Sequence, residues 1–224
     1  MLQINILVEG QTEETFIKEL LFPYLFSRNI LINPVIISTK RIKEGGKFKG
    51  GLTNSNFELF INDLQRLIRS TPQGYVTTFI DYYRIPSKFP GYNERVVNST
   101  QLTKVTFLEQ KLFEYIGSPE NFIPYIQLHE FEAFHFSDKK GFESYLSPIE
   151  ANLNNLFQII DDYSNPEDIN EGPTTSPSKR IIANYSSYEK ITEGNLILME
   201  IGVEKILEKC NHFRSFVDIL IKLK

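Results

Sequence analysis

The sequence predicts an α/β protein with a mostly parallel sheet flanked by helices, followed by a helical C-terminal extension. Two observations predict this class. Apolar strand patterns alternate with helical patterns up to about residue 136, and the patterns beyond that point are helical. Such alternation is typical of strand–helix–strand units, which bury a parallel sheet between helices. We therefore expect one domain over residues 1–224, with a core of about 1–140 and a helical extension of about 141–224.

The first elements follow from the apolar spacing near the N-terminus. Residues 2–8 form an apolar run that predicts a buried strand, and residues 12–27 repeat apolar positions at helical spacing. Residues 31–38 are β-branched and apolar and predict a second strand. Residues 56–70 predict a helix, and residues 75–80 predict a third strand that ends before Asp81.

The remaining elements are less regular. Residues 98–116 predict a helix and residues 122–128 a further strand, with a turn or helix beginning at about 130. Within the extension, the apolar spacing predicts helices at about 148–160, 178–185 and 200–222.

Composition limits the class of protein. The chain is 41% hydrophobic and 23% charged, which is ordinary for a soluble globular protein. Its formal net charge of -4 argues against a simple basic DNA-coating protein, but it is compatible with a nuclease whose carboxylates bind cations. The single cysteine, Cys210, cannot form an internal disulfide and indicates a reducing compartment, so we expect a cytoplasmic protein. We expect no membrane span, because no apolar run reaches about 18 residues, and a homo-oligomer is compatible with the sequence.

Acidic residues follow three of the predicted strands. Glu9 and Glu13 follow the first strand, Asp81 follows the third, and Glu130 and Glu132 follow the fourth. The carboxyl ends of parallel strands share one edge of a sheet, so these side chains can converge there. Hard divalent cations such as Mg²⁺ or Mn²⁺ prefer oxygen ligands and remove the repulsion among carboxylates. The pattern therefore predicts a metal site formed by these five residues, provided that they lie within reach of one ion.

Each acidic position also has a structural explanation. Glu13 and Glu14 can be first-turn acids favoured by the helix dipole, with Thr12 as the N-cap. Asp81 can be a turn residue, and the two glutamates that flank Phe131 can alternate along a solvated strand edge. The repetition after three strands is what favours the metal site.

Two basic segments are candidates for binding phosphate. Residues 40–50 combine glycines with cations, among them Lys40, Arg41 and Lys47, which suit a loop that contacts nucleic acid. The alternative is a solvated surface loop.

The second basic segment lies at the predicted start of a helix. Thr175 or Ser176 can cap a helix whose first residue is Pro177, and Lys179 and Arg180 add positive charge beside its free N–H groups. We expect both to contact phosphate, and Lys179 is also a catalytic candidate. A capped helix with surface cations is the alternative.

Histidines flank the acidic pair at 130 and 132. His129 is a candidate for general acid–base chemistry or for a phosphate contact, whereas a lone histidine such as His135 is more often a packed residue. We see no nucleophile elbow, no phosphate-binding loop of ATPases and no zinc-ligand spacing in the sequence.

Four segments resemble known families. Residues 6–13 resemble the first motif of Toprim-like domains, especially those of OLD-family nucleases. Residues 79–83, 123–133 and 172–180 resemble an uncharacterised bacterial family, which is called a domain of unknown function and is grouped with the Toprim-like folds. The likeness covers nearly the whole chain and implies a Toprim-like, Rossmann-like sheet.

The resemblance also implies roles for residues. Glu9 matches the Toprim glutamate and Asp81 the first acid of an Asp-x-Asp pair, whereas Tyr83 stands where the second Asp is expected. Glu130 and Glu132 are our candidates for supplying the missing oxygens. The resemblance implies an Mg²⁺- or Mn²⁺-dependent nuclease acting on DNA or RNA in defence against phage or mobile elements, with a separate ATPase as partner. The alternatives are a non-catalytic binding or sensor subunit and a metal-dependent hydrolase of a small phosphorylated substrate.

Overall fold

A parallel sheet forms the centre of the computed structural model, which describes residues 1–224 except 39–50, 84, 96–98, 170–171, 173 and 224. Its strands are β1 (Leu2–Val8), β2 (Ile30–Ile36), β3 (Tyr75–Asp81), β4 (Phe122–Ile123) and β5 (Ile126–Gln127). They lie in the order β2-β1-β3-β4, and β5 also pairs with β3. All the pairings are parallel. The α/β class with a mostly parallel sheet flanked by helices is therefore confirmed.

Helices cover both faces of the sheet. One face packs against α3 (Phe57–Ser70) and α4 (Gln101–Ile116), and the other packs against the helical segment after β1 and α10 (Asn211–Lys222). Alternate residues of β1 divide accordingly, since Ile4 and Ile6 belong to one core cluster and Leu7 to the other.

Three predicted elements differ from the structure. The helix predicted at 12–27 is interrupted by a π-helical turn, Ile17–Leu21, between α1 (Gln11–Phe16) and α2 (Phe22–Phe26). Pro23 lacks an N–H group and cannot continue the regular hydrogen-bond ladder, which accounts for the widened turn. The strand predicted at 122–128 is divided into β4 and β5, with Pro124 between them.

The helix predicted at 200–222 is also divided. It spans the end of α8 (Glu193–Ile201), α9 (Val203–Lys209) and α10, and Gly202, between α8 and α9, has a φ of 81° in the left-handed region. The extension further contains α5 (Lys139–Tyr145), α6 (Leu153–Asp162), α7 (Pro177–Asn184) and α8 (Glu193–Ile201), together with the short 3-10 turns Phe131–Ser137 (η3) and Pro166–Asp168 (η4). A further 3-10 turn, Tyr92–Glu94, lies before α4. No helix among the described residues combines the length and apolar character needed to cross a bilayer.

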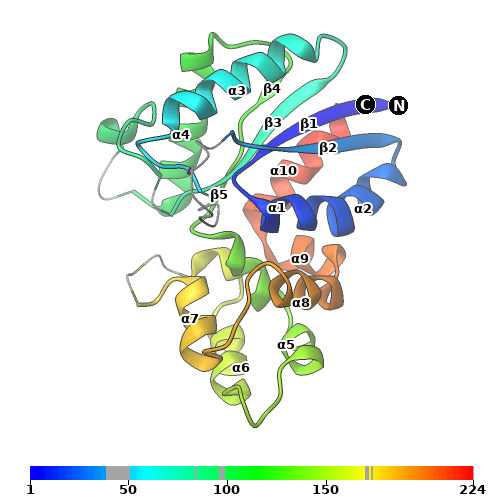
Figure 1. Ribbon diagram of the computed structural model, residues 1–224, viewed down its shortest axis with the longest axis vertical. Coiled ribbons are helices and arrows are strands. Elements are labelled where there is room, and N and C mark those ends of the chain that lie inside the picture. Colours follow the sequence, from blue (N-terminus) through cyan, green and yellow to red (C-terminus); the bar gives the residue numbers. More distant parts are fainter. Residues whose placement is uncertain (39–50, 84, 96–98, 170–171, 173, 224) are drawn as a thin grey trace, which may run out of the picture.

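The helical extension shares its core with the sheet. Aromatic rings from β3, α1, η3 and α10 form one buried group, which comprises Phe16, Phe79, Phe131, Phe134 and Phe213. The strands point their carboxyl ends toward the region where the extension begins (Figure 1). The extension therefore packs against the carboxyl edge of the sheet.

A buried glutamate fixes the start of α10. Glu167 is 1% exposed, and its carboxylate accepts hydrogen bonds from the N–H groups of His212 at 2.7 Å and Phe213 at 3.0 Å. The side chain of Cys210, the N-cap residue, makes no capping hydrogen bond, so Glu167 supplies the cap from a distant part of the chain.

Replacement of Glu167 by Ala is expected to lower the free energy of unfolding by about 2 kcal/mol, because two buried N–H groups lose their acceptors. Glu167→Gln keeps one acceptor oxygen and should lose less. Urea unfolding of the three proteins measures this. Equal stability of the Ala variant and the wild type would contradict the capping role.

His212 joins α10 to the sheet and predicts a pH dependence. Its Nε2 lies 3.0 Å from the carbonyl oxygen of Ile126 and 3.4 Å from a carboxylate oxygen of Glu109. Burial opposes protonation of His212, but the hydrogen bond and charge of Glu109, the charge of Glu167 and the Ile126 carbonyl together outweigh it, and the pKa is raised above 6.5. The charged form thus stabilises the fold below about pH 6.5, and this contribution is lost as pH rises through the folded-state pKa.

We expect the free energy of unfolding to fall across that pH window in the wild type. His212→Gln retains a donor toward Ile126 and should remove this part of the pH dependence. Urea unfolding at a series of pH values checks the difference. Parallel pH profiles for the two proteins would contradict it.

Candidate functional site

The point where the strand order reverses lies between β1 and β3. The chain passes from β1 to β2 on one side and then returns across β1 to β3, so the carboxyl ends of β1 and β3 border a topological switch point. Glu9 follows β1 directly, and Asp81 is the last residue of β3. Ligands of open α/β sheets bind in this crevice.

Glu9 connects three segments. One carboxylate oxygen accepts a hydrogen bond from the N–H of Asp81, and the other accepts one from the N–H of Leu52, both at 2.8 Å. Burial, and next the charge of Glu13, raise the pKa of Glu9 to about 7. The ionised form of this strand-end carboxylate is thus less favoured than that of a glutamate in water.

Asp81 links β3 to the extension. Its Oδ1 accepts a hydrogen bond of 2.9 Å from the N–H of Phe131, the first residue of η3. Burial and the neighbouring charge of Glu9 raise the pKa of Asp81 well above its ordinary value, despite an opposing effect of Lys190. The prediction that Asp81 lies at the end of this strand is confirmed. Asp81 is not a solvated turn residue, because its carboxylate holds the start of η3.

Two further carboxylates complete the group. Glu13 lies in the first turn of α1 and Glu132 in η3, with exposed fractions of 6% and 1%. Burial is also the main cause that raises the pKa of Glu13. We call Glu9, Glu13, Asp81 and Glu132 the acidic cluster. The alternative of a solvated strand edge is wrong for Glu132, because η3 is a buried 3-10 turn.

Lys190 supplies a positive charge that the sequence analysis did not identify. Its Nζ lies 2.8 Å from Glu132 Oε1 and 3.9 Å from Glu13 Oε1, while 42% of its side chain is exposed. Burial disfavours the ammonium, but Glu132, Glu13 and Asp81 together raise the pKa of Lys190 well above its usual value. Lys190 follows no strand and belongs to no motif, so no local sequence pattern identifies it as a residue of the site.

The first turn of α1 differs in detail from the prediction. Gly10 is the N-cap residue in place of Thr12, which is buried within the helix. Glu14 forms an exposed ion pair with Lys18 at 2.7 Å, as a surface helix acid does. The structural explanation therefore fits Glu14, and Glu13 belongs to the acidic cluster.

Glu130 faces a different element. Its Oε2 accepts a hydrogen bond of 2.9 Å from the N–H of Ser178 at the start of α7. Ser176 is the N-cap residue and Pro177 the first residue of α7, as predicted, but the Ser176 side chain makes no capping hydrogen bond. A carboxylate of the protein thus binds the N–H of Ser178, one of the groups expected to meet a phosphate.

The basic residues of α7 differ from each other. Lys179 is exposed. Arg180 donates from Nε to the carbonyl oxygen of Thr175 at 2.6 Å and from Nη2 to the Tyr163 hydroxyl at 3.3 Å. Lys40, Arg41 and Lys47 lie outside the described residues. The chain on either side of that segment lies near the cluster, since the Ile37 N–H binds the Val8 carbonyl and the Leu52 N–H binds Glu9.

The two histidines are buried. His129 is 2% exposed and has a φ of 59°, and its carbonyl oxygen accepts a hydrogen bond from the N–H of Tyr83. His135 Nε2 lies 3.0 Å from the carbonyl oxygen of Gly194 and 3.2 Å from the hydroxyl of Tyr188. Burial lowers the pKa of His135 to about 4, so it is neutral at physiological pH. This agrees with a packed histidine.

The chemistry of the acidic cluster suits a hard cation, because every candidate donor is a carboxylate oxygen. Oxygens that accept one backbone N–H retain a second lone-pair position. The spacing of these carboxylates, however, does not yet form a complete set of ligands. Among the described residues, no three Asp, Glu, His or Cys side chains are arranged closely enough to hold a metal ion. Binding at this point thus requires at least one carboxylate to move toward the others.

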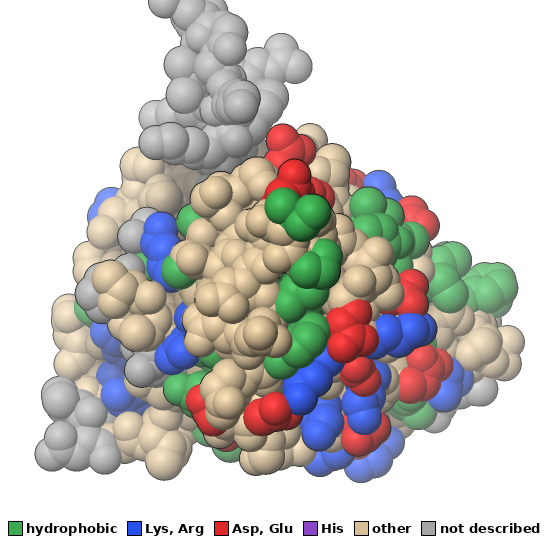
Figure 2. Space-filling view, turned by 90° about the horizontal axis from the view of Figure 1, so that it is seen from below, with side chains coloured by type: hydrophobic (Ala, Val, Ile, Leu, Met, Phe, Trp, Pro, Cys, Tyr) green, Lys and Arg blue, Asp and Glu red, His purple; other side chains and the backbone are tan. Residues whose placement is uncertain are grey.

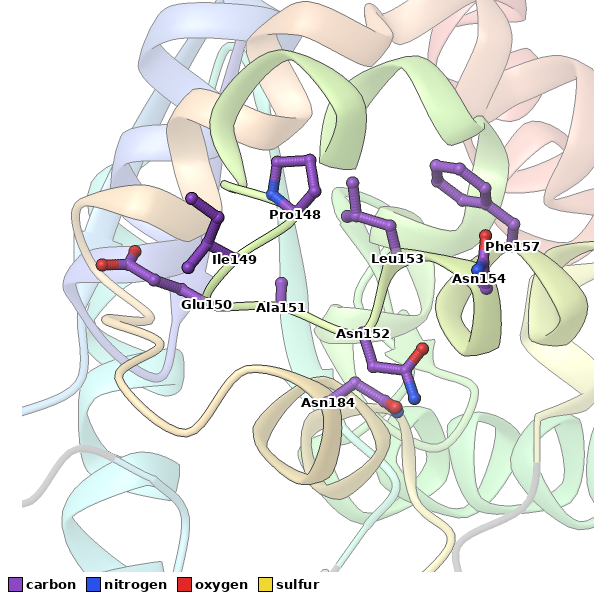
Figure 3. A pocket seen from close by; sticks show the side chains of 9 residues that line it. All are labelled: Pro148, Ile149, Glu150, Ala151, Asn152, Leu153, Asn154, Phe157 and Asn184. Atoms are coloured by element: carbon purple, nitrogen blue, oxygen red, sulfur yellow. The ribbon is translucent and has the colours of Figure 1, made fainter.

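A shallow cavity lies elsewhere in the extension (Figure 3). It has a volume of ≈ 670 Å³ and is lined by the segment from Pro148 to Leu153 together with Asn154, Phe157 and Asn184. Glu150 is its only acidic or basic lining residue, and no member of the acidic cluster lines it. The surface seen from the extension side mixes Lys and Arg with Asp and Glu around a line of apolar side chains (Figure 2). Neither feature marks a phosphate-binding site.

The fold and the switch-point site define a Rossmann-like α/β protein with an acidic cluster at the carboxyl edge of its sheet. Residues 8–221 match the family described as Domain of unknown function (DUF4276), and the chain belongs to this family. No curated protein and no solved structure gives a significant match.

Proposed function

We propose that the protein is a divalent-metal-dependent nuclease with a Toprim-like site, in which Mg²⁺ or Mn²⁺ binds the acidic cluster. One observation carries the proposal: four carboxylates gather at the switch point, and among the described residues the ammonium of Lys190 pairs with two of them, Glu13 and Glu132. Burial and mutual repulsion raise the pKa of Glu9, Glu13 and Asp81, so the cluster has a strong tendency to take up positive charge.

The residues proposed to hold the cation are Glu9 and Asp81, with Glu132 and Glu13 as the nearest further donors. Glu130 requires a larger change, since it first has to leave the N–H of Ser178. Glu132 thus replaces the oxygen that the expected second Asp supplies at the position of Tyr83. A bound cation would lower the pKa of a water molecule and offset negative charge on a phosphate.

We propose a nucleic acid as the substrate because cationic residues lie near the acidic cluster. Ile37 and Leu52, which lie near the two ends of the cation-rich segment, are both close to Glu9. Lys179 is exposed on α7, the helix that Glu130 contacts. A polyanion bound across the carboxyl edge of the sheet would meet these cations. By resemblance we further propose a separate ATPase partner and a role in defence against phage.

An assay of the purified protein with Mg²⁺ or Mn²⁺ on mixed DNA and RNA tests the proposal, with Glu9→Gln as the matched variant. Cleavage by the wild type that is lost in Glu9→Gln supports it. Equal cleavage by both proteins would count against it. No cleavage by either, together with no metal binding in calorimetry, would overturn it.

The second candidate is a non-catalytic Toprim-like subunit. The ion pair between Lys190 and Glu132 favours it, because the cluster is already partly neutralised by the protein itself. Metal binding measured by calorimetry separates the candidates. A wild-type protein that binds no divalent cation is the result expected for the non-catalytic subunit. Cleavage of a small phosphate ester, but not of a polymer, would instead indicate a small-molecule hydrolase.

A further inference from the structure

The loop that carries Lys190 is attached to η3 at two points. This Lys190 loop, residues 185–192, connects α7 to α8. Lys190 pairs with Glu132, and the Tyr188 hydroxyl lies 3.2 Å from Nε2 of His135, one turn further along η3. A Cβ at Gly194 would lie only 2.6 Å from that hydroxyl, so the glycine permits this close packing. The Tyr188 contact can therefore keep the loop in place without the ion pair.

The loop is also held by α8. Two carboxylate oxygens of Glu193 accept hydrogen bonds from the Tyr185 hydroxyl at 2.8 Å and from the Glu189 N–H at 2.7 Å. Movement of the Lys190 side chain thus does not require the loop backbone to unfold. The ammonium is buried against the acidic cluster, whereas 42% of the side chain as a whole is exposed, so rotation about the side-chain bonds alone can carry the ammonium toward water.

We infer that Lys190 is a built-in competitor of the divalent cation: it pairs with Glu132 and Glu13 in the metal-free protein and is displaced into solvent when the metal binds. This inference rests on the proposed metal site and adds its regulation. An ammonium 2.8 Å from Glu132 repels a divalent ion that approaches the same oxygens. Leaving the cluster releases Glu132 and Glu13 as ligands at the same time.

Calorimetric titration with Mn²⁺ alone tests the inference on the full chain. Lys190→Met keeps the length of the side chain and removes the charge, and we expect it to bind Mn²⁺ at least about tenfold more tightly than the wild type. Lys140→Met is the matched control, since Lys140 forms a 2.6 Å ion pair with Glu200 outside the acidic cluster. The control changes net charge equally and should retain the wild-type affinity.

The outcomes separate the inference from the proposed function. Equal Mn²⁺ affinity of the wild type and Lys190→Met would overturn the inference and leave the metal site standing. Absence of binding in both would overturn the metal site and the inference together. Binding by Lys190→Met alone would support both.

A second measurement uses the wild type and does not depend on the folding of a variant. Acetylation of lysines by an amine-reactive ester, followed by mass spectrometry, reports how free each ammonium is. We expect a severalfold faster reaction of Lys190 in the presence of Mn²⁺ and an unchanged rate for Lys140. Unchanged or slower reaction of Lys190 in protein that binds Mn²⁺ would overturn the inference.

Discussion

Replacement of Asp81 by Asn is expected to reduce metal-dependent cleavage by about a hundredfold or more while leaving the fold at least as stable as the wild type. Asn retains an oxygen for the N–H of Phe131 but removes one charge from the acidic cluster. The metal loses a ligand, and the metal-free protein loses a source of repulsion. Opposite changes in activity and stability are the signature of a site that is strained for function.

The pH dependence of stability sharpens this prediction. The pKa of Asp81 is raised well above 3.8 in the folded protein, so the folded state binds this proton more tightly than the unfolded state. The contribution of Asp81 to the free energy of unfolding therefore becomes less favourable as pH rises above about 3.8. Asn does not titrate, so the advantage of the variant should grow over that range.

Thermal unfolding in the presence of a chelator, at several pH values, measures the stability difference. Asp218→Asn is the matched control, because it makes the same chemical change at an exposed position of α10. It should alter neither activity nor the pH profile. A large loss of stability in Asp81→Asn would mean that the carboxylate is a structural group and would remove this argument for a cation site.

The strand ends could be located from sequence because the signal is local. An apolar run that stops at a carboxylate predicts both the buried strand and the position of the acid, and Glu9 and Asp81 follow this rule. Parallel pairing then brings them to one edge without further information. The same reasoning found Glu132 but also grouped it with Glu130, whose side chain faces α7.

Lys190 could not be found in this way. It is far from Glu132 in sequence, and its position depends on how α8 packs against η3. No periodicity encodes that packing, which is decided by close contacts such as the one at Gly194. For the same reason the sequence predicted oxygens for a metal but not the ammonium that lies among them.

Helix interruptions form a second group of errors. Gly202 and Cys210 divide the segment predicted as one helix, although the apolar spacing continues across both. The break becomes intelligible once Glu167 is known to cap α10, because a distant carboxylate stabilises a new helix start that the local sequence does not mark. Tertiary contacts here outweigh the spacing that predicted a continuous helix.

Replacement of Phe213 by Ala is expected to lower the free energy of unfolding by about 3–5 kcal/mol, the range for large-to-small changes of buried aromatic residues. Phe213 is 0% exposed, and its ring centroid lies 4.7 Å from that of Phe134 and 6.1 Å from that of Phe79. It therefore fills space between α10, η3 and β3. Ile219→Ala on the same helix is the control, since Ile219 is 47% exposed and its truncation should cost little.

The same variant tests whether residues 1–224 form one folding unit. If the helical extension and the sheet share one core, urea unfolding of Phe213→Ala should remain a single transition shifted to lower urea. Far-ultraviolet circular dichroism and the emission of the 11 tyrosines should report the same midpoint, and the chain has no tryptophan to obscure the second signal. Two separated transitions would instead show that the extension unfolds by itself. The acidic cluster would then lie at a boundary between two domains, because Glu9, Glu13 and Asp81 come from the core whereas Lys190 comes from the extension.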